Sequence, residues 1–462
     1  MRLVKINIIL AAIMAFCSVA FGAANQSADA QITKNVLENG VTVVVKPEKG
    51  SGLIAIDVMI RAGAAQESIQ NAGIGNFVAQ LVLASTRLSS AEEVAAVADE
   101  VGGSIGAQWQ RDYTEIRAIT TTSMFNKSMT LIGECLTQAS FEDKWVEQVR
   151  EKLLRSLRTD SDDIFENAYT DLRSLLYEDN GYRRQNLGIE RTIKLATAQD
   201  LKKFYATYYV PNNIVVSIAG DVTVEQAIDR VEKIFAGIPE AKLPIDRGVP
   251  DETLERSKFL ASEVDITTAY LMIGWLAPGV KSVDYPAVSV AANALGGGKG
   301  SIMFRELRQK KGIGYDVGTI YPRFKYQSHV VAYVITNPFK TEEFSANPNG
   351  LLEQVKTSLL EQVNQLKQKP LSDQELQRAK GYTIGTYALS HQHLQDRAYE
   401  LGWTEITGAG YEMYKRFPDD VEKVTAEDVQ RVASKYFNNY AAVVLLPKVQ
   451  SPPVTSENNT SK

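Results

Sequence analysis

The sequence predicts an α+β protein made of two similar domains, each a mainly antiparallel β-sheet with helices packed on one face. Two segments that lie 228 residues apart, 197–222 and 425–448, both open with Thr-Ala, then Gln or Glu, then Asp. A Thr at this position caps a helix, and the apolar, β-branched run that follows predicts a strand. Each half also begins with strand-like runs and has a helix-rich middle, which favours a sheet with helical insertions. The same order in both halves indicates a duplication.

The first element in the chain is a predicted signal peptide at residues 1–24. Arg2 and Lys5 supply its positive start, an apolar stretch follows from Ile6 to Phe21, and small residues come next. A membrane-spanning helix needs about 20 apolar residues, so this shorter run favours cleavage over a retained anchor. We therefore expect an exported protein of the bacterial periplasm, with no membrane span after signal cleavage. Cys135 is then the sole cysteine, which excludes an intrachain disulfide.

Prolines and charged residues mark a boundary between the two halves. The predicted segments, in order, are the signal peptide, an N-terminal domain at 25–240, a linker at 241–258, a C-terminal domain at 259–448 and a disordered tail at 449–462. Predicted strands open both domains: Val41–Val45 and Leu53–Arg61 in the first, Thr268–Leu276 in the second. The tail is polar throughout and is not expected to fold.

Composition excludes several classes of protein. The chain has 462 residues, of which 44% are hydrophobic and 23% charged, as in ordinary globular proteins. Its net charge of −5 argues against a dedicated nucleic-acid binder, which carries a basic excess. Two cysteines do not make a disulfide scaffold, and three histidines make a histidine-rich metal site a poor candidate.

Residues 73–86, GIGNFVAQLVLAST, predict a helix with a broad apolar side. Asn76, Ala79 and Gln80 stand at i, i+3 and i+4 and so share one face of that helix. This segment resembles the zinc-binding helix of the pitrilysin/insulinase family, most closely its processing-peptidase subfamily. In that family the helix carries His-x-x-Glu-His, whose imidazoles hold zinc while the glutamate activates water. The resemblance extends from about Ile32 to Lys448 and implies a processing-peptidase-like duplication.

The resemblance places three unsuitable side chains at the zinc site. Asn76 stands at the first ligand, Ala79 at the base and Gln80 at the second ligand. The family's third ligand, a glutamate, falls at Arg155 or Ser156 in a predicted helix over 149–158. Amides are poor zinc ligands, and alanine accepts no proton. The resemblance therefore implies no metal ligand and no catalytic residue of its own in this chain, and a buried amphipathic helix is the simplest interpretation of residues 73–86.

Other catalytic arrangements find little support. His329 lies in a strand-like run, while His391 and His393 are two residues apart and would point to different sides of a helix. Cys135 lies in a helix-like context with no histidine nearby in the sequence. Direct hydrolysis by another arrangement is the weakest of three hypotheses.

Residues 295–316, LGGGKGSIMFRELRQKKGIGYD, predict a glycine turn followed by a basic helix that ends at Gly312. In the family, the second half carries such a turn, with an Arg and a Tyr seven residues apart that reach the zinc half and hold substrate. Arg308 and Tyr315 match that pair, and Gly296, Gly297 and Gly298 would line the substrate path. A guanidinium and a phenol can donate hydrogen bonds to a peptide carbonyl and to an oxyanion. Ile302 departs from the Arg that is common after the serine.

The resemblance implies a non-catalytic, Arg/Tyr-type subunit of an exported zinc metallopeptidase heterodimer. Such a chain would bind extended peptide and complete the active site of a homologous partner that carries His-x-x-Glu-His. No cofactor is expected in this chain, zinc is expected in the partner subunit, and the chain by itself should not hydrolyse peptides. The alternative is a catalytically dead scaffold or peptide-binding protein of the same fold, because a fold does not imply a function.

Overall fold

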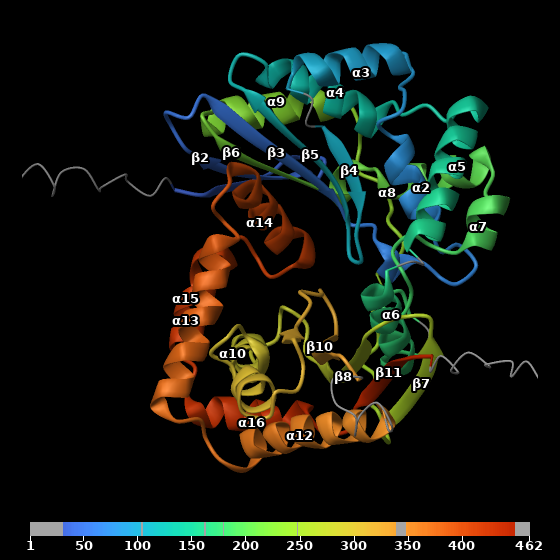
Figure 1. Cartoon of the computed structure of the whole chain (residues 1–462). Coiled ribbons are helices and arrows are strands. Elements are labelled where there is room, and N and C mark those ends of the chain that lie inside the picture. The colour runs from blue at the N-terminus through green and yellow to red at the C-terminus, as the bar shows by residue number, and fades with distance from the viewer. Residues whose placement is uncertain are drawn as a thin grey trace, which may run out of the picture.

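The computed structural model describes residues 31–102, 105–160, 163–178, 180–246, 248–338 and 348–448. The predicted signal peptide at 1–24 and the predicted tail at 449–462 lie outside the described residues. Two sheets lie one above the other in Figure 1, each with helices of its own half on its outer side.

The first sheet has six strands in the order β1-β2-β6-β3-β5-β4. All neighbouring strands are antiparallel except β2 and β6, which are parallel. The strands are Thr33–Val36 (β1), Thr42–Pro47 (β2), Leu53–Ile60 (β3), Gly106–Trp109 (β4), Thr114–Thr121 (β5) and Ile214–Gly220 (β6).

The second sheet repeats this arrangement with five strands in the order β7-β11-β8-β10-β9. Its single parallel pair is β7 and β11, which stand where β2 and β6 stand in the first sheet. The strands are Lys258–Val264 (β7), Ala269–Ala277 (β8), Asp316–Ile320 (β9), Ser328–Thr336 (β10) and Ala441–Pro447 (β11). The same order and the same parallel pair confirm the predicted α+β class and its duplication.

Helices fill the segments between the strands. In the first half they are Ile74–Leu81 (α2), Ala91–Glu100 (α3), Phe125–Thr137 (α4), Asp143–Asp160 (α5), Ile164–Leu176 (α6), Glu190–Leu195 (α7), Ala198–Tyr208 (α8) and Val224–Phe235 (α9). In the second half they are Tyr285–Gly296 (α10), the π-helical Phe304–Lys310 (η3), Pro348–Gln368 (α12), Asp373–Leu389 (α13), Leu394–Thr407 (α14), Met413–Glu422 (α15) and Ala426–Tyr436 (α16). None of the helices in the described ranges has the length and apolar character that crossing a membrane requires.

The repeated Thr-Ala-x-Asp segments form equivalent capping boxes. The Thr197 hydroxyl accepts a hydrogen bond from the Asp200 amide at 3.2 Å, and the Thr425 hydroxyl accepts one from the Asp428 amide at 3.1 Å. In both boxes the aspartate carboxylate accepts the threonine amide in return. The capped helices, α8 and α16, lead into the equivalent strands β6 and β11.

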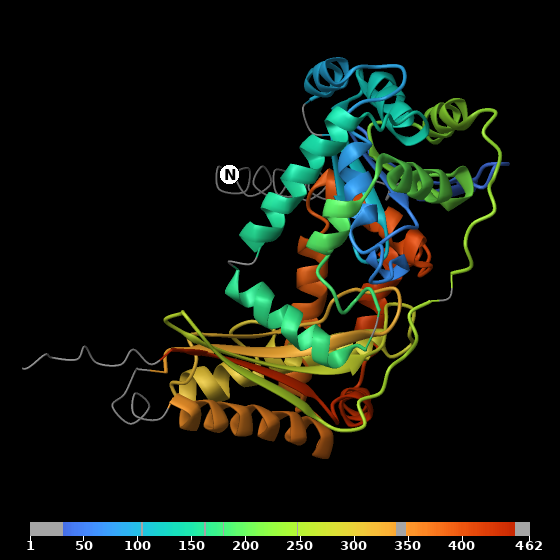
Figure 2. The same cartoon turned by 90° about the vertical axis from the view of Figure 1, so that its right-hand side faces the viewer.

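The sequence did not predict that the two halves exchange a helix. α14, from the second half, packs on β3 and β6 of the first sheet, and α6, from the first half, packs on β8 and β11 of the second (Figures 1 and 2). The Ser217 hydroxyl on β6 donates to the Ala398 carbonyl of α14 at 2.7 Å. A Cβ on Gly402 of α14 would lie 2.6 Å from the Ser217 hydroxyl, so glycine permits this close approach. Each sheet is therefore covered on both faces.

Candidate functional site

The α2 helix carries the three positions at which the resemblance placed the zinc chemistry. Asn76 is 4% exposed, and its amide donates to the Leu187 carbonyl at 3.2 Å. Ala79 is fully buried in the core of the first domain. The Gln80 side-chain oxygen accepts a hydrogen bond from the Lys152 ammonium of α5 at 2.9 Å. All three side chains are therefore engaged in contacts within the domain.

These side chains do not fit zinc. The face of α2 presents two amides and a methyl group, and the Lys152 cation lies beside it, where it would repel a second cation. At the third-ligand position, Arg155 is exposed and pairs with Glu151 at 3.6 Å, and Ser156 is half-buried. Within the described ranges, no three His, Cys, Asp or Glu side chains cluster in a way that could hold a metal ion.

The predicted helix over 73–86 is shorter in the structure. It begins after Gly73, whose φ of 102° places it in the left-handed region, and it ends at Leu81. Beyond this end, Thr86 forms an isolated bridge with Ala139, and its hydroxyl accepts the amide of Ser89 at 2.9 Å. After Leu81 the Ala84 amide bonds to the Leu81 carbonyl at 2.8 Å, three residues back instead of four, so the chain tightens into turns there.

A buried carboxylate closes the N-terminal end of α2, and the sequence analysis missed it. Glu67 is 7% exposed and accepts the amides of Gly73 at 3.0 Å and Gly75 at 2.8 Å. Burial raises the pKa of Glu67 to about 7, although both amide bonds lower it. A Cβ on Gly75 would overlap the ring of Trp109, so the helix can approach β4 only with glycine there. Glu67 lies six residues before the N-cap Gly73, and the first turn of α2 holds no acidic residue, so no local sequence signal indicated this cap.

The second motif leaves its two matching side chains free for contacts with another molecule. Arg308 is exposed at the end of η3, with its guanidinium 5.1 Å from the centre of the Phe304 ring. Tyr315 is 51% exposed in the loop before the edge strand β9, and its amide donates to the Ile335 carbonyl at 3.0 Å. Neither side chain makes a hydrogen bond or ion pair with a described residue. A π-helical turn such as η3 is uncommon and often accompanies functional sites.

The glycines of this motif have a packing role in the fold. A Cβ on Gly296 would lie 2.6 Å from the Thr319 amide of β9. Added Cβ atoms on Gly297 and Gly298 would lie 2.9 and 2.7 Å from the Tyr382 ring of α13, and Gly298 has a φ of 70°. The turn therefore requires small residues even without substrate, and its role in lining a substrate path stays a prediction.

The histidines do not supply another site. His329 is fully buried on β10, where each ring nitrogen lies 2.7 Å from a tyrosine hydroxyl, that of Tyr169 or Tyr177. Burial lowers the pKa of His329 well below its usual value, so the ring is neutral. The prediction that His391 and His393 share a helix was wrong, because His391 lies in the turn after α13 and His393 is the N-cap of α14.

The remaining thiol is not a nucleophile in this conformation. Cys135 is fully buried in α4, and burial raises its pKa to about 12, with the Glu134 carboxylate adding to the effect. A thiol of this kind stays protonated at neutral pH. It therefore lacks the thiolate that attack on a peptide bond requires.

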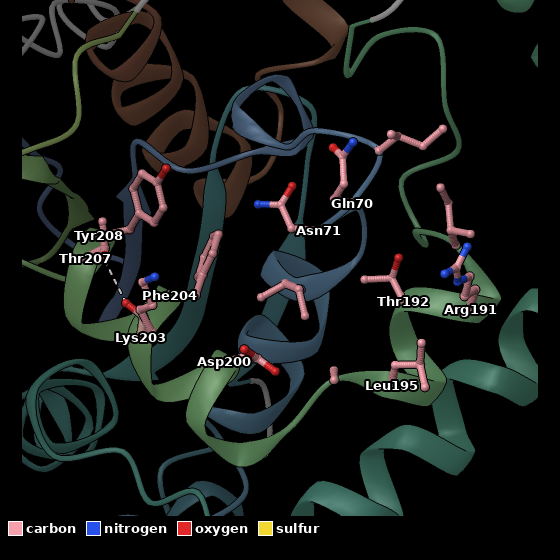
Figure 3. A pocket seen from close by; sticks show the side chains of 14 residues that line it. Gln70, Asn71, Arg191, Thr192, Leu195, Asp200, Lys203, Phe204, Thr207 and Tyr208 are labelled. Atoms are coloured by element: carbon pink, nitrogen blue, oxygen red, sulfur yellow. Dashed lines mark hydrogen bonds between the residues drawn. The ribbon is translucent and has the colours of Figure 1, made fainter.

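An open cleft of about 850 Å³ lies beside α2, between α7, α8 and the loop that precedes α2 (Figure 3). Its floor includes Ile74 and Phe204, and its polar side chains include Arg191, Asp200 and Lys203. None of the three zinc-motif positions of α2 lines it. The cleft is therefore distinct from the face of α2 that resembles a zinc site.

Comparisons with known proteins agree with this geometry. Residues 42–190 match the family described as insulinase (peptidase family M16), and residues 196–382 match the peptidase M16 inactive domain. The chain belongs to the insulinase family. Among M16 relatives, an uncharacterized zinc protease of Bacillus subtilis is 23% identical over 91% of this chain and 100% of its own length. One from Mycobacterium tuberculosis is 24% identical over 90% and 93%.

Solved structures share the fold of this M16 chain. A protease from Helicobacter pylori superposes with a TM-score of 0.82 at 21% identity, over 90% of this chain and all of that one. A peptidase M16 inactive domain from Pseudomonas fluorescens gives a TM-score of 0.79 at 18% identity, over 92% and 100%. At this level of identity the likeness establishes the two-domain fold, and activity must be argued from the residues.

Proposed function

We propose that this chain is the non-catalytic, Arg/Tyr-type subunit of an exported zinc metallopeptidase heterodimer. It would bind extended peptide and complete the active site of a homologous partner that carries His-x-x-Glu-His and zinc. The observation that carries the proposal is the contrast between its two motifs. Asn76, Ala79 and Gln80 are committed to contacts within the domain. The side chains of Arg308 and Tyr315 are exposed and form no hydrogen bond or ion pair with a described residue.

The chemistry of Arg308 and Tyr315 suits a contact to substrate. A guanidinium carries its charge at any relevant pH, and it can donate two hydrogen bonds at once to a carbonyl or carboxylate. A phenol adds one donor that strengthens when negative charge develops on the peptide oxygen. Neither group can activate water, so both depend on a partner that supplies the metal and the base.

A second candidate function is a scaffold or peptide-binding protein with no role in proteolysis. The packing of Gly296–Gly298 against Thr319 and Tyr382 is consistent with it, because this packing accounts for the three glycines without a substrate path. The two functions differ in what Arg308 does, since only the first requires its guanidinium for a reaction.

The test is to purify the tagged mature chain from its native envelope extract, identify the proteins that accompany it, and measure zinc and peptidase activity. A stoichiometric homologue with His-x-x-Glu-His is expected, with zinc and activity only in the complex. Within that complex, Arg308→Ala should lower kcat/KM about tenfold or more, and Tyr315→Phe should lower it to a smaller extent.

Lys310→Ala is the matched control, because Lys310 is exposed on the same helix and, among the described residues, forms an ion pair only with Glu306, at 2.6 Å. Its activity should equal that of the unmodified pair. An active complex whose rate is unchanged by both Arg308→Ala and Tyr315→Phe would refute the completed active site. A chain that purifies by itself, or as an inactive homodimer, would favour the scaffold.

A further inference from the structure

The cleft between α7 and α8 has a counterpart in the second domain. That second cleft, of about 550 Å³, lies between α15, α16 and the loop that precedes α10. Asp200 and Lys203 in the first cleft lie 228 residues before Asp428 and Arg431 in the second. The duplication therefore produced an equivalent cleft in each domain, with an aspartate and a cation on equivalent turns of α8 and α16.

The two clefts differ in how the cation on the equivalent turns of α8 and α16 is paired, while Lys281 of the second cleft forms no ion pair with a described residue. In the second cleft Arg431 pairs with Asp284 at 2.7 Å and with Asp428 at 3.2 Å. Arg416 and Lys423 both pair with Asp420, at 3.2 and 3.4 Å. The cations that α15, α16 and the turn between them contribute to this cleft therefore all form ion pairs within the domain.

In the first cleft the cations lack such partners. Arg191 of α7 and Lys203 of α8 lie on opposite sides of the cleft (Figure 3), and neither forms an ion pair with a described residue. The loop before α2 contributes the neutral side chains of Gln70 and Asn71. Asp200 is held in its capping box, where its carboxylate accepts the Thr197 amide at 2.9 Å. Two positive charges therefore face the cleft against one committed carboxylate.

The walls of the first cleft combine this charge with apolar surface. Ile74 and Phe204 are each 7% exposed and form its floor. Ile69 and Leu195 stand at its rim and are 52% and 68% exposed. A small molecule in the cleft would leave both rim side chains in water, whereas a polypeptide could cover the floor and the rim together.

We propose that the α7–α8 cleft docks an acidic, aliphatic segment of a partner protein. Aliphatic side chains of that segment enter over Ile74 and Phe204 and cover Leu195, while its carboxylates pair with Arg191 and Lys203. Charge complementarity selects this partner, because the equivalent cleft of the second domain has neutralised the same position. The proposal does not depend on proteolysis, since neither the zinc-motif face nor Arg308 and Tyr315 line the cleft.

The test is to select binders from a random peptide library, about twelve residues long and displayed on phage, against the immobilised mature chain. Recovered peptides are expected to combine Asp or Glu with Leu, Ile or Met. Their affinity, measured by fluorescence anisotropy, should fall about tenfold or more in the double variant Arg191→Glu/Lys203→Glu and in Leu195→Asp. Binding should also weaken as salt is added.

Lys202→Glu is the matched control, because Lys202 is the exposed neighbour of Lys203 on α8 and does not line the cleft. It should bind the peptides as the unmodified chain does. All the altered side chains are exposed, and unchanged melting temperatures would verify that the variants fold. Failure to enrich any peptide, peptides without acidic residues, or peptides that bind the double variant equally well would each overturn the proposal.

Discussion

At the scale of single residues, the three positions of α2 that resemble a zinc site each make contacts within the domain. The Asn76 amide donates a hydrogen bond to a backbone carbonyl, and the Ala79 methyl group packs in the core. The Gln80 side-chain oxygen accepts a hydrogen bond from Lys152. An alanine at the position of the base removes the proton acceptor and lets the neighbouring core close over that position. Each replacement is therefore explained by packing or hydrogen bonding.

Substitutions at two adjacent positions of α2, one buried and one accessible, should differ in their effect on stability. Ala79→Glu places a carboxylate in the core and should lower the free energy of unfolding by about 3 kcal/mol or more. Gln80→Glu places the same group beside the Lys152 ammonium and should change stability by less than about 0.5 kcal/mol. Urea denaturation of both variants checks this. Equal losses would show that the two positions share one environment.

Glu67 predicts a pH dependence of stability. Its pKa rises from 4.5 to about 7 on folding, so the native state binds the proton more tightly than the unfolded chain. Its contribution is complete below pH 4.5 and is lost as the pH rises to about 7, by about 3 kcal/mol in total. Glu67→Gln should flatten this part of the profile. Parallel denaturation profiles for the two proteins would contradict the assignment.

At the scale of elements, α14 owes its place to small side chains. Ala398 and Gly402 face Ser217 of β6, and the Ser217 hydroxyl bonds to the Ala398 carbonyl and, at 3.2 Å, to the Asp57 carbonyl. Ion pairs to the first half reinforce the contact: Arg397 pairs with Glu48 at 2.8 Å. A helix from one half thus lies against the sheet of the other with little space between them.

Two glycines within helices give a matched test of this contact. Gly402→Ala would place a methyl group 2.6 Å from the Ser217 hydroxyl and should destabilise the protein by about 1–3 kcal/mol. Gly385→Ala in α13, where an added Cβ meets nothing within 4 Å, should stabilise it by about 1 kcal/mol. Thermal unfolding of both variants measures the difference. Stabilisation by both would mean that α14 lies farther from β6.

At the scale of the whole molecule, the face of the first sheet under α14 buries two carboxyl groups. Asp57 and Glu115 are 0% and 1% exposed on neighbouring strands. Burial raises the pKa of both groups, and Glu115 raises that of Asp57 further, while Arg117 lowers both. Gln395 of α14 donates to Asp57 at 3.4 Å. Burial at the interface between the halves therefore favours the protonated form of Asp57.

This buried pair predicts that the molecule loses stability in alkali. Because the folded pKa values are raised, the contribution is present at low pH and is lost as the pH rises through them. Asp57→Asn has nearly the same shape but does not titrate, so its stability should fall less than that of the unmodified protein as the pH rises. Asp229→Asn, at an exposed ion pair, is the control. Identical alkaline profiles would exclude the pair as the cause.

Much of the fold was predictable because it depends on local patterns. The predicted strands over 41–45, 53–61 and 268–276 correspond to β2, β3 and β8 within one or two residues. The 228-residue repeat predicted equivalent helix–strand units. At the α2 site, the residue types predict that no family-type zinc centre forms, since ligand chemistry depends on the side chain itself.

Only the tertiary structure decided what these elements contact. Helix periodicity shows that α6 and α14 each have an apolar side, but not that each covers the sheet of the other half. Likewise, the folded chain places the Glu67 carboxylate at the N-terminal end of α2. It also places the Lys152 ammonium beside the Gln80 side chain. The sequence by itself determined the strands, the duplication and the missing zinc ligands, because these follow from local pattern and side-chain chemistry. The helix exchange, the buried carboxyl pair and the unpaired cations of the α7–α8 cleft depend on distances between segments that are remote in the chain.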